Sequence, residues 1–119
     1  MSLSFEHISN EKESLNLTYK SPTGEKVDLL WEELRKNESS KKFDEVEKNY
    51  LELVELGCRT AMNNLAVYYE KKKDYPQMGK FYFMAIKLGC GTAMYNISLY
   101  YENVENYKEM KKYLQMGVE

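Results

Sequence analysis

Two copies of one sequence stretch decide the fold: Leu56-Gly57-Cys58-Arg59-Thr60-Ala61-Met62 and, 32 residues later, Leu88-Gly89-Cys90-Gly91-Thr92-Ala93-Met94. The match continues, since Asn64, Tyr68, Tyr69 and Glu70 recur as Asn96, Tyr100, Tyr101 and Glu102. The other half of the unit occurs three times, as Phe43, Val46 and Lys48, then Tyr75, Met78 and Lys80, then Tyr107, Met110 and Lys112. Repetition with a period of this size is typical of proteins that stack one structural unit.

Each repeat contains two helix patterns. The first places apolar residues at i, i+3, i+4 and i+7, on one face of a helix: Met62, Leu65, Ala66 and Tyr69, then Met94, Ile97, Ser98 and Tyr101. The second is apolar on two sides, which favours a helix packed between neighbours: Met78, Phe81, Tyr82, Met84, Ala85, Ile86 and Leu88. Glycine ends helices readily, so Gly57 and Gly89 mark the ends of these second helices.

These patterns predict an all-α fold in one domain of residues 21–119, because 119 residues leave room for only one core. The expected helices span about 42–56, 59–72, 75–88, 91–103 and 107–117. A diverged first helix is expected at 22–37, where Val27, Leu30, Trp31 and Leu34 share one face. Residues 1–20 form an N-terminal arm whose order stays open between a short strand, an ordered arm and disorder.

Composition narrows the classes of partner and compartment. The net charge of −2 argues against a nucleic-acid partner, which usually requires a basic excess. Apolar runs are far shorter than the ~20 residues of a membrane span, and the amino terminus has no secretory signal pattern, so we expect a cytoplasmic protein without membrane contact. Cys58 and Cys90 lie one repeat apart, farther than the ~7 Å that a disulfide allows, and are expected to be reduced.

Catalytic chemistry finds little support in the sequence. His7 is the only histidine, and it lies far from Cys58 and Cys90 in the chain. Two cysteines and one distant histidine do not form the close ligand pairs of a structural zinc site. The sequence therefore predicts a protein that is not an enzyme and has neither a metal nor a cofactor.

The face opposite the buried stripe of each first helix is the candidate site. At 100° per residue it consists of Thr60, Asn63, Val67 and Glu70, and of Thr92, Tyr95, Leu99 and Glu102. The candidate contacts with a partner are apolar residues on an exposed face and amides that can pair with a peptide backbone. They are Asn63, Asn64, Val67, Tyr95, Asn96 and Leu99. The alternative for the asparagines is that they satisfy backbone groups between adjacent repeats.

The spacing Gly57-x3-Ala61-x3-Leu65-x3-Tyr69, followed by Tyr75-x2-Met78-x3-Tyr82-x2-Ala85, resembles the Sel-like repeats, a branch of the tetratricopeptide superfamily. The resemblance covers roughly residues 43–119. It implies a right-handed α-solenoid of antiparallel helix pairs, with about two and a half to three repeats of 32 residues, that acts as an adaptor. The chain departs from the family in its shorter unit and in Ala66 and Ser98, where glycine is common.

The leading functional hypothesis is a non-catalytic interaction module that binds a peptide or protein on the concave face of this solenoid. The alternative is a self-assembling structural protein, a homo-oligomer that stacks through its terminal helices, where Tyr113, Leu114 and Met116 have no covering helix after them. Charge is also uneven: residues 1–57 contain 8 basic and 13 acidic groups, and residues 58–119 contain 9 and 6. Such an asymmetry is consistent with head-to-tail association of copies and equally with a local solvation pattern.

Overall fold

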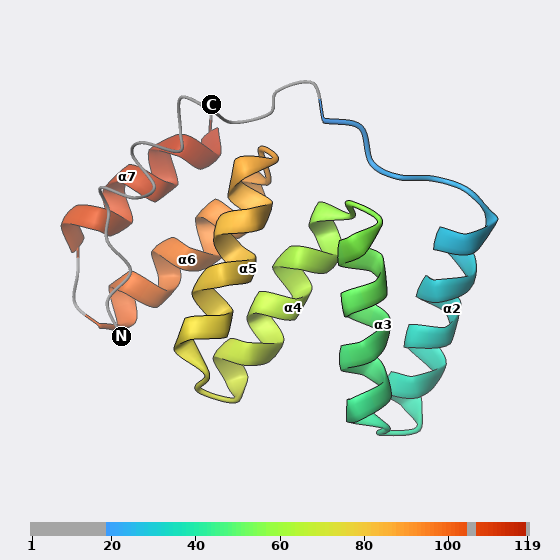
Figure 1. The fold of residues 1–119 in the computed structure, drawn as a ribbon. Coiled ribbons are helices and arrows are strands. Elements are labelled where there is room, and N and C mark those ends of the chain that lie inside the picture. Colours follow the sequence, from blue (N-terminus) through green and yellow to red (C-terminus); the bar gives the residue numbers. More distant parts are fainter. Residues whose placement is uncertain (1–18, 105–106, 119) are drawn as a thin grey trace.

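The computed structural model describes residues 19–104 and 107–118, and these residues form helices and turns without a strand (Figure 1). The helices, in chain order, are α2 (Glu25–Ser39), α3 (Phe43–Glu55), α4 (Arg59–Lys71), α5 (Tyr75–Lys87), α6 (Gly91–Asn103) and α7 (Tyr107–Val118). The predicted all-α fold class is therefore confirmed. The open question about the order of the N-terminal arm falls on residues 1–18, which lie outside the described residues.

Each helix packs against the next helix in the chain, so the helices lie side by side in sequence order (Figure 1). The turns between consecutive helices from α2 to α6 are short, and each of them reverses the chain direction. Helix α5 contacts both α4 and α6, as its two apolar sides predict. Its residues Met78, Phe81, Tyr82, Ala85 and Ile86 are all buried.

The buried faces follow the predicted periodicity. On α4 they consist of Met62, Leu65, Ala66 and Tyr69, and on α6 of Met94, Ile97, Ser98 and Tyr101. Val27, Leu30 and Leu34 are buried on α2, while Trp31 is only half-buried. These side chains belong to one continuous hydrophobic core, so the described helices share a single packing interior.

Four turns share one backbone geometry. Lys41, Gly57, Lys73 and Gly89 have φ of 57°, 85°, 61° and 80°, and they are spaced 16 residues apart. The residue after each of them donates its amide to the carbonyl five residues earlier, at 2.9–3.1 Å. This is the Schellman hydrogen bond that ends a helix. Gly57 and Gly89 therefore end α3 and α5 as predicted, and two lysines adopt the same conformation at the ends of α2 and α4.

The first helix begins later than the sequence predicts. Helix α2 starts at Glu25 rather than at residue 22, because Gly24 has a positive φ of 123° with ψ 170°, a non-helical conformation that glycine adopts readily. It also continues to Ser39, two residues beyond the predicted end, until the turn at Lys41 stops it.

Contacts between helices recur with the 32-residue period. The side-chain amide of Asn37 donates to that of Asn49 at 2.7 Å, and at the equivalent positions the rings of Tyr69 and Phe81 stack with centroids 5.7 Å apart. The adjacent pairs Tyr68–Tyr69 and Tyr100–Tyr101 both have ring centroids 5.5 Å apart. The repeat is therefore a repeat of contacts as well as of residues.

Tyr19 anchors the chain that leads into α2. Its hydroxyl donates to the carbonyl of Gly57 at 2.7 Å and accepts the amide of Arg59 at 3.0 Å. The Arg59 guanidinium lies 4.4 Å from the centre of the Tyr19 ring and donates to the carbonyl of Leu88 at 2.6 Å. One tyrosine and one arginine thus connect this segment to the α3–α4 turn and to the end of α5.

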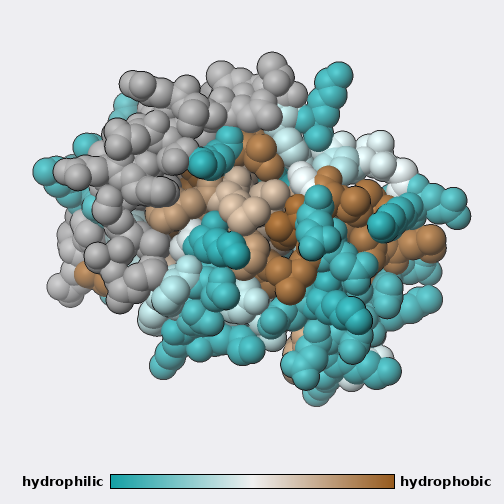
Figure 2. All heavy atoms as spheres, viewed as in Figure 1, coloured by the Kyte–Doolittle hydropathy of each residue, from teal (hydrophilic) through white to brown (hydrophobic). Residues whose placement is uncertain are grey.

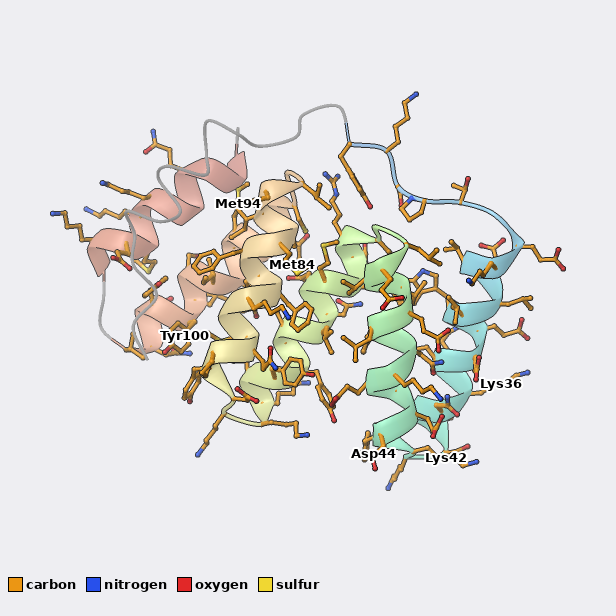
Figure 3. The ribbon with its side chains drawn as sticks, viewed as in Figure 1. Lys36, Lys42, Asp44, Met84, Met94 and Tyr100 are labelled. Carbon is orange, nitrogen blue, oxygen red and sulfur yellow. The ribbon has the colours of Figure 1, made fainter. Side chains whose placement is uncertain are left out.

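The surface has both hydrophobic and hydrophilic side chains. On the face drawn in Figure 2, hydrophobic side chains gather over the middle of the array, around α3 and its neighbours, and hydrophilic side chains surround them. At the edge where α2 turns into α3, Lys42 and Asp44 point away from the helices (Figure 3). Lys36 forms an exposed ion pair with Glu32 at 3.6 Å, which contributes little to stability.

Candidate functional site

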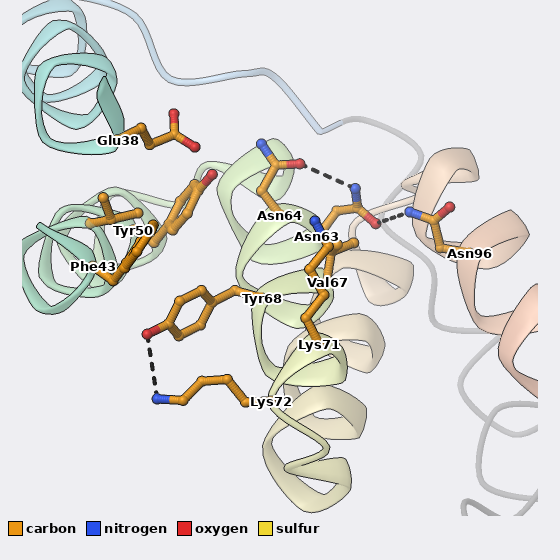
Figure 4. Close-up of a pocket in the computed structure, with 11 residues that line it drawn as sticks. Glu38, Phe43, Tyr50, Asn63, Asn64, Val67, Tyr68, Lys71, Lys72 and Asn96 are labelled. Atoms are coloured by element: carbon orange, nitrogen blue, oxygen red, sulfur yellow. Dashed lines mark hydrogen bonds between the residues drawn. The ribbon is translucent and has the colours of Figure 1, made fainter. Parts of the chain in front are cut away.

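A groove of about 600 Å³ lies along α4, between the ends of α2 and α3 on one side and α6 on the other (Figure 4). Four of the six candidate residues line it: Asn63, Asn64, Val67 and Asn96. The fold therefore brings together residues from two copies of the repeat. Val67 is half-buried and packs against the core, so its outer atoms form part of the apolar lining.

The three asparagines form a connected network across the groove. Asn96 on α6 donates its side-chain amide to the Oδ1 of Asn63 at 3.0 Å (Figure 4). Asn63 in turn donates to the Oδ1 of Asn64 at 3.4 Å. Side chains of α6 and α4 are thereby held in fixed orientations relative to one another.

The position of Asn63 differs from the sequence expectation. The helical period predicts that this side chain points away from the buried face, yet only 5% of Asn63 is exposed. The reason is that α6 lies beside α4 and supplies Asn96, which covers and hydrogen-bonds it. The asparagines thus bond one another between repeats through their side chains, whereas the alternative considered from sequence was a bond to backbone groups.

Seven further residues line the groove that the sequence argument did not select: Glu38, Phe43, Val46, Tyr50, Tyr68, Lys71 and Lys72. Phe43, at the first turn of α3, is 54% exposed although it is aromatic. Exposed aromatic side chains in a groove are common anchors for partners. The signal in the sequence was its equivalence to Tyr75 and Tyr107, which marks an aromatic position at the start of every second helix.

Burial raises the pKa of Tyr50 above its usual value, and the nearby negative charge of Glu38 raises it further. The side-chain amide of Asn64 lowers this pKa and so acts in the opposite direction. Tyr50 also contacts the edge of Trp31, with ring centroids 6.3 Å apart. The hydroxyl is therefore held in its protonated form, with α2, α3 and α4 all contributing to its surroundings.

The groove lining also includes two lysines from the end of α4. Lys71 and Lys72 lie at the last turn of α4, and the Nζ of Lys72 donates to the Tyr68 hydroxyl at 3.4 Å and lies 5.0 Å from the centre of its ring. This hydrogen bond raises the pKa of Lys72 above its usual value. Lysines are favourable at the end of a helix, where they oppose its dipole.

Tyr95 and Leu99 are exposed as predicted, at 50% and 38%, but neither lines the groove. They lie on α6, and their role as contact residues stays a prediction. The side chains of Tyr113, Leu114 and Met116, on which the self-assembly hypothesis depends, lie outside those that the structure describes. Stacking through the carboxyl-terminal helix also stays a prediction.

The described part of the chain has few groups that could form a disulfide or bind a metal ion. Cys58 and Cys90 are buried and not bonded to each other. Residues 19–104 and 107–118 contain no group of three or more histidines, cysteines or carboxylates that could hold a metal ion. His7 lies outside these ranges.

Within the described residues, every helix is too short or too polar to span a bilayer. The resemblance to Sel-like repeats stays a prediction, because comparisons with protein-family models, curated proteins and solved structures found no match to this chain.

Proposed function

We propose that the protein is a non-catalytic interaction module that binds a peptide segment of a partner protein in the groove along α4. The main observation in support is that one groove of about 600 Å³ gathers amide, apolar and charged side chains from four helices. A few oriented polar groups among apolar ones are typical of ligand sites. The proposal includes a cytoplasmic location, where thiols such as those of Cys58 and Cys90 stay reduced.

The proposed architecture is a right-handed α-solenoid of two and a half to three Sel-like repeats. It is supported by the 32-residue recurrence of turns and contacts, such as the φ angles of Gly57 and Gly89 and the ring pairs of Tyr68 and Tyr100 with their neighbours. In such an array, one helix of each repeat faces the concave side. The groove residues on α4 and α6 are then equivalent positions of successive repeats.

The network of asparagines suits this role because it is already ordered without a ligand. Each side-chain amide has two N–H groups and an oxygen with two lone pairs, and the network uses only part of this capacity. The remaining donors and acceptors of Asn64 and Asn96 are available to the backbone of an extended peptide. Preorganised groups lose less entropy on binding, which favours affinity.

Selection from a displayed library of random nine-residue peptides tests the proposal. Phe43→Ser removes an aromatic side chain that is 54% exposed in the groove, whereas Leu29→Ser removes an apolar side chain that is 56% exposed on α2 and does not line it. We expect peptides selected on the unmodified protein to lose at least fivefold in affinity for the Phe43→Ser variant and to keep their affinity for Leu29→Ser.

The control matters because both substitutions remove an equally exposed apolar group and should affect folding equally. Circular dichroism checks that both variants keep their helices. If no peptide is enriched, or if the enriched peptides bind the Phe43→Ser variant as tightly as the unmodified protein, the groove is not the binding site. The double variant Tyr95→Ser/Leu99→Ser then tests whether the contact surface extends onto the exposed face of α6.

A further inference from the structure

One corner of the groove is acidic. Among the described residues that line the groove, only Glu38, near the end of α2, has a carboxylate. This side chain is exposed, and its charge acts on the hydroxyl of Tyr50 on α3, whose pKa it raises. The amide of Asn64 on α4 acts on the same hydroxyl. A carboxylate, a phenol and an amide from three helices therefore converge at one point, which we call the Glu38 corner (Figure 4).

The two lysines of α4 that line the groove do not neutralise this carboxylate. The charges that act on Lys72 are those of Glu47 and Asp44 on α3, so its own charge is balanced there. Lys71 points toward the α6 side of α4 (Figure 4). Both cations are thus directed away from Glu38.

The lysines that lie near Glu38 in the sequence are also directed elsewhere. Lys36 pairs with Glu32 on the surface of α2 at 3.6 Å. Lys41 and Lys42 line a neighbouring hollow at the start of α3, and Lys42 points away from the helices (Figure 3). The negative charge of Glu38 is therefore available to a ligand in the groove, and it is complementary to a cation.

The wall beside the Glu38 corner is formed by α3 and is apolar. Phe43, Val46 and Tyr50 are spaced at i, i+3 and i+7, so they share one face of this helix, and all three line the groove. Phe43 is largely exposed, whereas Val46 and Tyr50 are buried. The faces of aromatic rings attract cations. The long stems of lysine and arginine pack on apolar surface while the charged end stays at a polar group. This wall therefore suits a basic side chain.

We propose that the Glu38 corner binds a lysine or arginine side chain of the partner segment. The charged end of that side chain pairs with the carboxylate of Glu38 beside the hydroxyl of Tyr50, and its aliphatic stem packs against the wall at Phe43. This inference rests on the proposed function and adds the chemistry of the ligand to it.

The test uses the same library of random nine-residue peptides and compares the unmodified protein with the Glu38→Gln and Glu33→Gln variants. Glu33→Gln is the matched control, because Glu33 is an exposed glutamate of the same helix that does not line the groove. On the unmodified protein and on the control, we expect enriched peptides to share a Lys or Arg at one aligned position. On Glu38→Gln, this preference should disappear.

An individual enriched peptide gives the magnitude. Replacing its Lys or Arg by Gln should weaken binding to the unmodified protein about two- to fivefold, because exposed ion pairs contribute modestly. The same replacement should have almost no effect on binding to Glu38→Gln. The basic preference should also weaken when NaCl is raised, since salt screens exposed charges.

The outcomes separate the two proposals. Enriched peptides that depend on Phe43 but share no Lys or Arg would overturn the inference and leave the proposed function intact. A basic preference that persists on Glu38→Gln would also overturn it, because the basic residue would then bind elsewhere. Absence of any enriched peptide that depends on Phe43 would refute the proposed function itself, and this inference with it.

Discussion

The hydrogen bond between Tyr82 and Glu70 offers the sharpest test of the packing. Tyr82 on α5 is 0% exposed, and its hydroxyl donates to Oε1 of Glu70 on α4 at 2.8 Å. Tyr82→Phe removes this hydroxyl and preserves the ring, so it creates almost no cavity. A hydrogen bond to a charged group contributes about 1.5–3 kcal/mol, and because the half-buried Glu70 regains some water, we expect a loss of about 1–2 kcal/mol.

Urea unfolding followed by far-ultraviolet circular dichroism measures this loss as a lower midpoint with an unchanged slope. A loss of this size lowers the melting temperature by roughly 5–10 °C in a domain of about 100 residues. Tyr95→Phe is the matched control, because Tyr95 is 50% exposed and should change the free energy of unfolding by less than about 0.5 kcal/mol. Equal stability of Tyr82→Phe and the unmodified protein would refute the hydrogen bond between α4 and α5.

The same substitution has a predicted pH dependence. Burial raises the pKa of Tyr82 above its usual value, and the hydrogen bond with Glu70 and its negative charge raise it further. A raised pKa means that the stabilisation is complete below about pH 10, where the unfolded tyrosine is protonated, and is lost as the pH rises above it. The difference in stability between the unmodified protein and Tyr82→Phe should therefore shrink above pH 10, and a constant difference would contradict this assignment.

Three further substitutions test the turns, the arm and the core. Gly57→Ala should lower the free energy of unfolding by about 1 kcal/mol in urea, since the added Cβ meets no atom and only the left-handed φ of 85° is strained. Lys73→Gly should raise it by about 0.5 kcal/mol, because Lys73 already has a left-handed φ of 61°. Tyr19→Phe removes two hydrogen bonds and should lower stability by about 1 kcal/mol and speed proteolysis before α2, a change that unaltered cleavage would exclude. Leu65→Ala, at a fully buried site of α4, should cost about 2–5 kcal/mol in the same assay, and a cost below 1 kcal/mol would argue against a packed core there.

The sequence predicted the helices well because the spacing of apolar residues within one helix is enough to identify its buried face. Met62, Leu65 and Tyr69 on α4 are buried as their spacing requires, and the glycine turns lie where the repeat places them. The start of α2 was less predictable. Apolar spacing does not locate the first residue of a helix, and the positive φ of Gly24 decided it.

The groove was predicted only in part because it depends on relations between helices. The helical period of α4 selected Val67 and Asn63, but it does not show that α6 covers Asn63. Phe43 and Lys72 were missed for a related reason, since both lie at helix ends that approach the groove only after α3 folds back against α4. The residue pattern along one helix does not show which side chains of a neighbouring helix will lie against it.

The packing of each helix against its neighbour in the chain also bears on how quickly the protein folds. Residues in contact are separated by short stretches of sequence, so only short loops must close before the contacts between α2 and α3, or between α4 and α5, can form. Helical proteins with such a low contact order fold in microseconds to milliseconds. We therefore expect rapid folding that can start at any helix pair and spread to the next one along the chain.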